Sequence, residues 1–273
     1  MKFYLDTNCV RQFVNLKDYD NHHIFTSELA IHEIISGINS EEEYKKRKNI
    51  LISIKNSNMK ILWESPRTIM IEVFDLGYKD ADVKATEIMM NEIIQSKNYQ
   101  EIFSISYNLG GEDYTIHTFI DFDNSINESI QAMINEGIKF VPKKDKKEMR
   151  NDIEISPAHA QVQMEIIVRN ILMNEFNITN INDSRYIKAV DSFSKNRRLD
   201  NYMKSVFLSM HDRISNSQNA GKNDGFDYWH LVYSYDIDYF VSDDKFYKRL
   251  PVDILNINFL NSNDFVKLIN MKD

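Results

Sequence analysis

Four acidic residues lie near the expected ends of strands or within the helices that follow them: Asp6, Glu33, Asp227 and Asp244. In an α/β fold, such positions gather at one edge of the sheet. Carboxylates brought together repel one another unless a cation lies among them, and their hard oxygen atoms favour Mg²⁺ or Mn²⁺. A pair of such ions can generate hydroxide and stabilise both oxygens of an in-line phosphoryl displacement. These residues therefore predict a metal-dependent nuclease site.

Two of these assignments have a neighbouring competitor. Asp224 and Asp227 both suit the start of a helix, with Asp224 as the N-cap and Asp227 at the third helical position. The spacing to the Asp243–Asp244 pair favours Asp227 as the ligand, with Asp224 as an additional candidate. Asp243 takes the place of Asp244 as the expected ligand if the alignment of this segment is shifted by one residue. Because side chains alternate along a strand, only one of the two is expected to face the site. His230, one helical turn after Asp227, is either a phosphate contact or a core or surface histidine.

Hydrophobic periodicity predicts the elements that position these residues. Near the N-terminus it predicts strands over 2–5, 23–26 and 59–63, and helices over 8–16, 28–38 and 41–55. Near the C-terminus it predicts a short helix over 226–235, strands over 239–242 and 252–257, a helical turn over 245–250 and a closing helix over 264–271. Strands that alternate with helices indicate βαβ units around a mainly parallel sheet.

The stretch between these ends has a different pattern. Six segments within residues 67–222 have helical spacing, while 115–122 could instead form a strand. We therefore expect a discontinuous α/β domain, built from residues 1–66 and 223–273, that holds a mostly helical insertion over 67–222. An insertion of about 150 residues is within the usual size of a domain.

Three segments resemble the motif blocks of the PIN domain family. They are FYLDTN at residues 3–8, FTSELAIHEIISG at 25–37, and NDGFDYWHLVYSYDIDYFVSDDKF at 223–246. The family pattern is an N-terminal strand followed by D-[TS]-[NS], a Glu within a helix, an Asp that opens a helix, and a strand that ends in [TS]-x-D. The resemblance covers about the first 65 and the last 50 residues.

The resemblance implies a fold, an activity and a set of roles. It implies a three-layer α/β/α sandwich and a ribonuclease dependent on Mg²⁺ or Mn²⁺. Asp6, Glu33, Asp227 and Asp244 match the acidic quartet of the family, and Thr7, Asn8 and Ser242 match its supporting polar residues. The quartet is expected to hold the metal and a water that attacks an RNA phosphodiester, while the polar residues orient the carboxylates.

Composition excludes several other classes of chemistry. The single cysteine, Cys9, excludes an internal disulfide framework and a cysteine-based zinc cluster, and the seven glycines form neither a dinucleotide-binding motif nor a P-loop. The net charge of −8 argues against binding of nucleic acid by bulk charge alone. Two basic segments, Lys143–Lys147 and Lys195–Arg198, are candidates for following a phosphate backbone.

Other expectations concern partners and location. We expect RNA as the substrate, with DNA left open, and a homo-oligomer or a protein regulator that uses residues 67–222. No segment is apolar for long enough to span a bilayer and no export signal is visible, so we expect a cytoplasmic protein that is not bound to a membrane. One alternative is a non-catalytic interaction or scaffold protein on the same α/β platform. A weaker one is an aspartyl phosphatase, in which Asn8 would replace the required second Asp.

Overall fold

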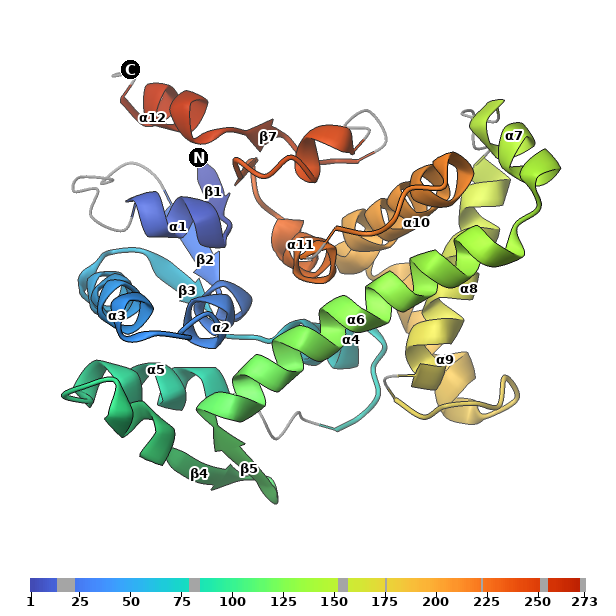
Figure 1. Ribbon diagram of the computed structural model, residues 1–273. Helices are drawn as coiled ribbons and strands as arrows, with labels where there is room; N and C mark the ends of the chain where they lie inside the picture. Colours follow the sequence, from blue (N-terminus) through green and yellow to red (C-terminus); the bar gives the residue numbers. More distant parts are fainter. Residues whose placement is uncertain are drawn as a thin grey trace.

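Five strands form one all-parallel sheet in the part of the chain that the computed structural model describes (Figure 1). The described residues are 1–13, 23–78, 84–151, 157–174, 176–221, 223–250 and 255–270. The strands are β1 (Lys2–Leu5), β2 (His23–Ser27), β3 (Lys60–Leu62), β6 (Tyr239–Val241) and β7 (Phe259–Leu260), in the order β3-β2-β1-β6-β7. The predicted α/β class with a mainly parallel sheet is confirmed.

The strand order puts β1 at the point where the connections reverse direction. From β1 the chain runs through β2 to β3 on one side of the sheet, and it later returns through β6 to β7 on the other. Leu5 of β1 is in register with Val241 of β6, and the N–H of Asp6 donates to the carbonyl of Val241 at 3.2 Å. In open α/β sheets, ligands bind at such a switch point, beyond the carboxyl ends of the strands.

Helices cover both faces of this sheet. They include α1 (Thr7–Phe13), α2 (Glu28–Ser36), α3 (Glu41–Asn56), α11 (Asp224–His230) and α12 (Ser262–Asn270), with 3₁₀ turns η3 (Leu231–Ser234) and η4 (Tyr247–Arg249). Side chains alternate along β1, so that Phe3 and Leu5 pack against α1, α2, α3 and α12. Tyr4 points to the opposite face and packs with residues of α11 and η3.

The central stretch is mostly helical, as predicted. Its elements are α4 (Pro66–Val73), α5 (Ala85–Gln95), η1 (Gln100–Ser104), β4 (Ser106–Leu109), β5 (Glu112–Thr115), α6 (Ile116–Phe140), α7 (Lys143–Asn151), α8 (Pro157–Asn174), α9 (Ser184–Lys195), η2 (Arg197–Leu199) and α10 (Asp200–Asn216). The exception is the antiparallel hairpin of β4 and β5. Thr115 and Thr118 form a capping box that starts α6, which is why 116–122 is helix and not strand.

Two hydrophobic cores join the central stretch to the α/β elements. One contains Tyr4 and Phe240 of the sheet together with Ile69 of α4 and Met203 of α10. The other contains Leu5 together with residues of α5 and α6. Residues 67–222 therefore share their hydrophobic cores with the two ends of the chain. No helix among the described residues is long and apolar enough to cross a membrane.

Three of the segments predicted near the two ends of the chain extend beyond the described residues. The helix predicted over 8–16 is described only to Phe13, and the helix predicted over 264–271 only to Asn270. Residues 252–254 of the strand predicted over 252–257 also lie outside the description. The last strand of the sheet instead runs over Phe259–Leu260, and it pairs with β6 through Phe240 and Val241.

His32 holds α2, the helix that carries Glu33, against α6 and α11. Its ring is buried, donates from Nε2 to the carbonyl of Phe119 at 3.2 Å, and stacks on Phe119 and Phe226 with ring centroids 4.8 and 5.8 Å away. Burial lowers the pKa of His32 from 6.5 to about 4. Because the pKa of His32 is lower in the folded protein, the stability linked to its neutral ring is fully present above pH 6.5. This stability is lost as the pH falls toward 4.

We expect protonation of His32 to lower the free energy of unfolding by about 3 kcal/mol when the pH falls from 7 to 4. The measurement is urea unfolding across this range for the wild type and His32→Phe, which keeps the stacking ring but does not titrate. The matched control is His117→Phe, because His117 is exposed. The expected result is a flatter pH dependence in His32→Phe alone, and equal slopes in all three proteins would contradict it.

Candidate active site at the sheet edge

Asp6 lies at the switch point and is held by groups from two elements. Its Oδ2 accepts a hydrogen bond from the hydroxyl of Ser242, which follows β6. Its Oδ1 accepts one from the backbone N–H of Cys9 in α1, at 2.9 Å. Burial raises the pKa of Asp6, although these hydrogen bonds oppose the rise. The contact between Asp6 and Ser242 follows from the pairing of β1 with β6.

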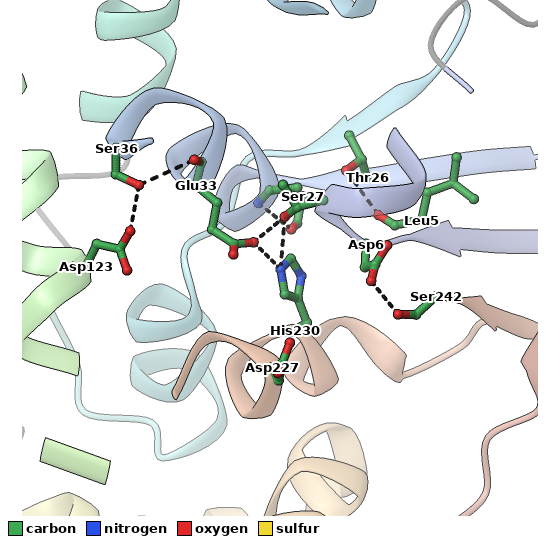
Figure 2. Close-up of polar contacts among 12 residues, drawn as sticks. Leu5, Asp6, Thr26, Ser27, Glu33, Ser36, Asp123, Asp227, His230 and Ser242 are labelled. Carbon is green, nitrogen blue, oxygen red and sulfur yellow. Dashed lines mark hydrogen bonds and ion pairs between the residues drawn. The ribbon is translucent and has the colours of Figure 1, made fainter. Parts of the chain in front are cut away.

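Glu33 links three helices around the same edge (Figure 2). Its Oε2 accepts a hydrogen bond from the hydroxyl of Thr7 in α1, and it lies 2.7 Å from Nε2 of His230 in α11. Burial acts to raise the pKa of Glu33, but the hydrogen bonds from His230 and Thr7 oppose the rise, and on balance the pKa is lowered. Glu33 is therefore a charged, hydrogen-bonded carboxylate.

His230 connects Glu33 to the sheet. Its side chain is 2 % exposed, and its Nδ1 lies 2.6 Å from the hydroxyl of Tyr4, which in turn lies 2.7 Å from Oγ of Ser27. Ser27 is also the N-cap of α2, where its Oγ accepts from the N–H of Ala30 at 3.3 Å. One proton arrangement satisfies these contacts: Ser27 donates to Tyr4, Tyr4 donates to Nδ1, and Nε2 donates to Glu33. His230 is thus a core residue that orients Glu33.

The start of α11 packs closely on α6. A Cβ atom on Gly225 would lie 2.8 Å from Cγ2 of Ile126, so only glycine fits at this approach. The N–H of Gly225 also donates to Oδ1 of Asn127, at 3.2 Å. These contacts fix the first turn of α11, which carries Asp227.

Asp227 is the carboxylate of the site that lacks protein donors. Within the described residues, nothing hydrogen-bonds to its side chain, and only its backbone carbonyl accepts, from the hydroxyl of Tyr247 at 3.0 Å. Burial raises the pKa of Asp227 well above its usual range. Nearby negative charges raise it further, in the order Asp244, Glu33, Asp224 and Asp6. The structure therefore brings the four predicted carboxylates close enough to interact.

The two competing carboxylates are engaged elsewhere. Asp224 forms an ion pair with Arg213, and both side chains are 8 % exposed. Asp243 accepts from the backbone N–H of Ser262 at 2.9 Å. The prediction that Asp224 is an N-cap is wrong, because Asn223 has that position and the carboxylate of Asp224 instead contacts Arg213.

Asp244 belongs to the turn that follows β6. Its N–H donates to Oγ of Ser242 at 3.0 Å, and its Oδ1 accepts from the N–H of Phe246 at 2.7 Å. Of the neighbouring charges, that of Asp244 raises the pKa of Asp227 most. Asn8, by contrast, is exposed, and no hydrogen bond joins its side chain to a carboxylate within the described residues. Thr7 and Ser242 therefore contact the acidic residues, and Asn8 does not.

The four carboxylates offer the oxygen ligands that Mg²⁺ or Mn²⁺ requires. Their side chains, however, do not converge on one point where an ion could bind. Among the described residues, no three His, Cys, Asp or Glu side chains form a group that could hold a metal ion as they stand. The carboxylate of Asp227 nevertheless lacks donors and is surrounded by other carboxylates, so a bound cation would relieve its repulsion. Hard oxygen ligands fit these two ions.

The two basic segments are largely engaged in contacts within the protein. In α7, Lys146 donates to the carbonyl of Ile138 at 2.6 Å. In the other segment, Lys195 pairs with Asp191 at 2.6 Å, and Arg198 pairs with Glu64 at 2.5 Å. Lys146 is therefore part of the fold, whereas Lys195 forms an exposed ion pair on the surface.

Sequence reasoning missed the groups that support Glu33. Tyr4 alternates with Phe3 and Leu5 in β1. The alternation predicts on which face of the sheet Tyr4 lies, but it does not predict which residue its hydroxyl contacts. The one feature of the sequence that could have indicated this support is a polar aromatic side chain, Tyr4, within an apolar strand that leads directly to Asp6.

Comparison with known proteins gives this chain no relatives: no family model, no curated protein and no solved structure matches it significantly.

Proposed function

We propose that this protein is a divalent-metal-dependent endoribonuclease. The observation that supports it most is Asp227 at the switch point of a parallel sheet. Its carboxylate accepts no hydrogen bond from the described residues and interacts with Asp244, Glu33 and Asp6. Such a concentration of negative charge at a partly buried edge is unfavourable for the fold alone, and strongly perturbed groups of this kind cluster at functional sites. The resemblance of the three motif blocks to the PIN domain family supplies RNA as the substrate.

The side chains have distinct roles in this proposal. Asp6, Asp227 and Asp244 hold Mg²⁺ or Mn²⁺, and Glu33 ligates a second ion or positions the attacking water. The metal supplies a nucleophilic water at neutral pH and charge stabilisation for the phosphoryl oxygens. Ser242 fixes one oxygen of Asp6 by its hydrogen bond.

The hydroxyl of Thr7 and the ring of His230 fix Glu33 from two sides. Tyr4 in turn fixes the ring of His230, so the orientation of Glu33 depends on the sheet itself. The carboxylate is thereby held ready for water or metal, which reduces the reorganisation needed in the reaction.

The wider context of the activity is also part of the proposal. The cytoplasm supplies both RNA and divalent cations. The central stretch, residues 67–222, shapes the approach of the substrate or provides the surface for a second copy or a regulator. DNA remains an alternative substrate for the same phosphodiester chemistry.

The test is cleavage of a mixed RNA pool with Mn²⁺ by the wild type, Asp6→Asn and Asp244→Asn. We expect each variant to lose activity on the order of 10³-fold, since a metal ion contributes several kcal/mol to the transition state. The matched control is Asp243→Asn, because Asp243 neighbours Asp244 but contacts Ser262, and it should keep near-wild-type activity. Equal background cleavage by all four proteins would refute the nuclease and favour a non-catalytic role for the fold.

A further inference from the structure

Arg11 lies on α1, next to the carboxylates but outside the roles given above. It follows Thr7 by one helical turn, so both residues lie on the same side of α1. The hydroxyl of Thr7 contacts Glu33, and this side of the helix therefore faces the site. Glu33, Glu43 and Asp6 are the negative charges that act on the guanidinium.

The guanidinium of Arg11 is partly buried and has no partner in the part of the chain that the structure describes. Its Nε is fully buried and lacks a hydrogen bond, and no ion pair or hydrogen bond joins Arg11 to another described residue. Burial and the charge of Arg47 lower the pKa of Arg11, so its positive charge is held at a cost to the fold.

Other buried or half-buried arginines of the chain are paired. Arg47, which also acts on Arg11, contacts Glu43 at 2.6 Å and the carbonyl of Glu33 at 2.9 Å. Arg213 pairs with Asp224. Arg11 has no partner among the described residues and lies beside an acidic site, so it breaks this pattern. Local exceptions of this kind are expected where a ligand binds.

A phosphate is the ligand that this environment requires. The nuclease site is rich in carboxylates, which repel the RNA backbone, and a cation beside them is needed to bring a phosphate close. A guanidinium offers a planar fork of N–H donors that matches two phosphate oxygens at once. We infer that Arg11 binds a backbone phosphate of the RNA next to the cleaved bond; this inference rests on the proposed nuclease function.

The test compares RNA binding by the full-length wild type, Arg11→Met and Arg11→Lys. Met keeps most of the apolar stem, and Lys keeps the charge without the fork. The probe is a fluorescein-labelled single-stranded RNA, and Ca²⁺ replaces Mn²⁺ as a hard cation that binds oxygen. The matched control is Arg185→Met, since Arg185 is an exposed arginine paired with Asp183 at 2.7 Å.

Arg11→Met is expected to raise Kd about tenfold and to reduce the slope of log K against log salt by about 0.7, the value for one phosphate contact on a single strand. Arg11→Lys should lie between Arg11→Met and the wild type, and Arg185→Met should match the wild type. Urea unfolding should show Arg11→Met to be at least as stable as the wild type, because an unpartnered buried donor is removed. A merely structural arginine would give lower stability with an unchanged salt slope.

The outcomes separate this inference from the proposed function. A Kd within twofold of the wild type and an unchanged salt slope in Arg11→Met would overturn the role of Arg11 alone. If RNA binding depends on Arg11 but cleavage with Mn²⁺ is the same for the wild type and Asp244→Asn, the nuclease fails and the phosphate site stands. A wild type that binds no RNA would overturn both.

Discussion

Replacing Asp227 by Asn is expected to stabilise the metal-free protein while it removes metal-dependent cleavage. In the wild type, the half-buried Asp227 side chain accepts no hydrogen bond from any described residue, and the charges of Asp244, Glu33 and Asp6 act on it. Asn has nearly the same shape but no charge, so the repulsion disappears. We expect a gain of about 1–2 kcal/mol in unfolding free energy, as for other strained functional positions, and a loss of cleavage on the order of 10³-fold.

The pH dependence of this gain has a defined sign. The pKa of Asp227 is raised in the folded protein, so its charge is unfavourable at pH 7 and the penalty vanishes as the pH falls toward the ordinary value of 3.8. Urea unfolding in EDTA should therefore separate the wild type and Asp227→Asn at pH 7 more than at pH 4. Added Mn²⁺ should stabilise the wild type alone.

Asp224→Asn is the matched control for Asp227→Asn. It changes an acidic residue of the same helical turn, but one that is paired with Arg213. This variant should lose stability at pH 7, because a buried cation is left without its partner. If Asp227→Asn is also less stable than the wild type in EDTA, the carboxylate is structural and the repulsion argued above is absent.

Replacing Arg213 by Met is expected to destabilise the protein by about 3–5 kcal/mol, because Asp224 is left as an unpaired buried charge. The two side chains form a buried ion pair between α10 and α11. Arg213 also donates to the carbonyl of Asn219 at 2.6 Å, and Asp224 accepts from the N–H of Gly221 at 2.8 Å. The pair therefore ties the central stretch to the turn that carries Asp227.

Urea unfolding of four proteins measures this coupling: the wild type, Arg213→Met, Asp224→Leu and the double variant. Replacing both charges by apolar groups removes the unpaired charge, so the double variant should recover much of the lost stability. Arg185→Met, at an exposed ion pair, should change stability by less than about 1 kcal/mol. Losses that simply add in the double variant would show that the two residues do not interact.

The order of elements could be predicted because each strand and helix has its own local pattern. The β-favouring run over Lys2–Leu5 gives β1 at its observed bounds. Ser27 caps α2 with its hydroxyl, a residue type that is common at this position. The last strand was misplaced, because Phe259–Leu260 is too short to leave a periodic signal and pairs only through tertiary contact with β6. The sequence pattern of residues 115–122 fits both a strand and a helix, and the capping box at Thr115 favours the helix.

The candidate site was predictable only where it depends on sequence neighbours or on adjacent strands. Asp6 and Ser242 meet because β1 pairs with β6. Arg213, the partner that engages Asp224, belongs to a helix of the central stretch that no motif connects to α11, so the sequence does not reveal this ion pair. The support of Glu33 by His230 and Tyr4 joins residues 226 positions apart in the chain, so only the folded structure reveals it.

The most direct test of the central claim is a crystal structure of the wild type soaked in Mn²⁺, with anomalous scattering recorded at the manganese edge. The claim that these carboxylates hold a catalytic metal predicts an anomalous peak bonded to oxygen atoms of Asp6, Asp227 and Asp244. The peak should be absent in Asp227→Asn crystals treated in the same way. No peak at this edge of the sheet in the wild type, or an equal peak in Asp227→Asn, would contradict it.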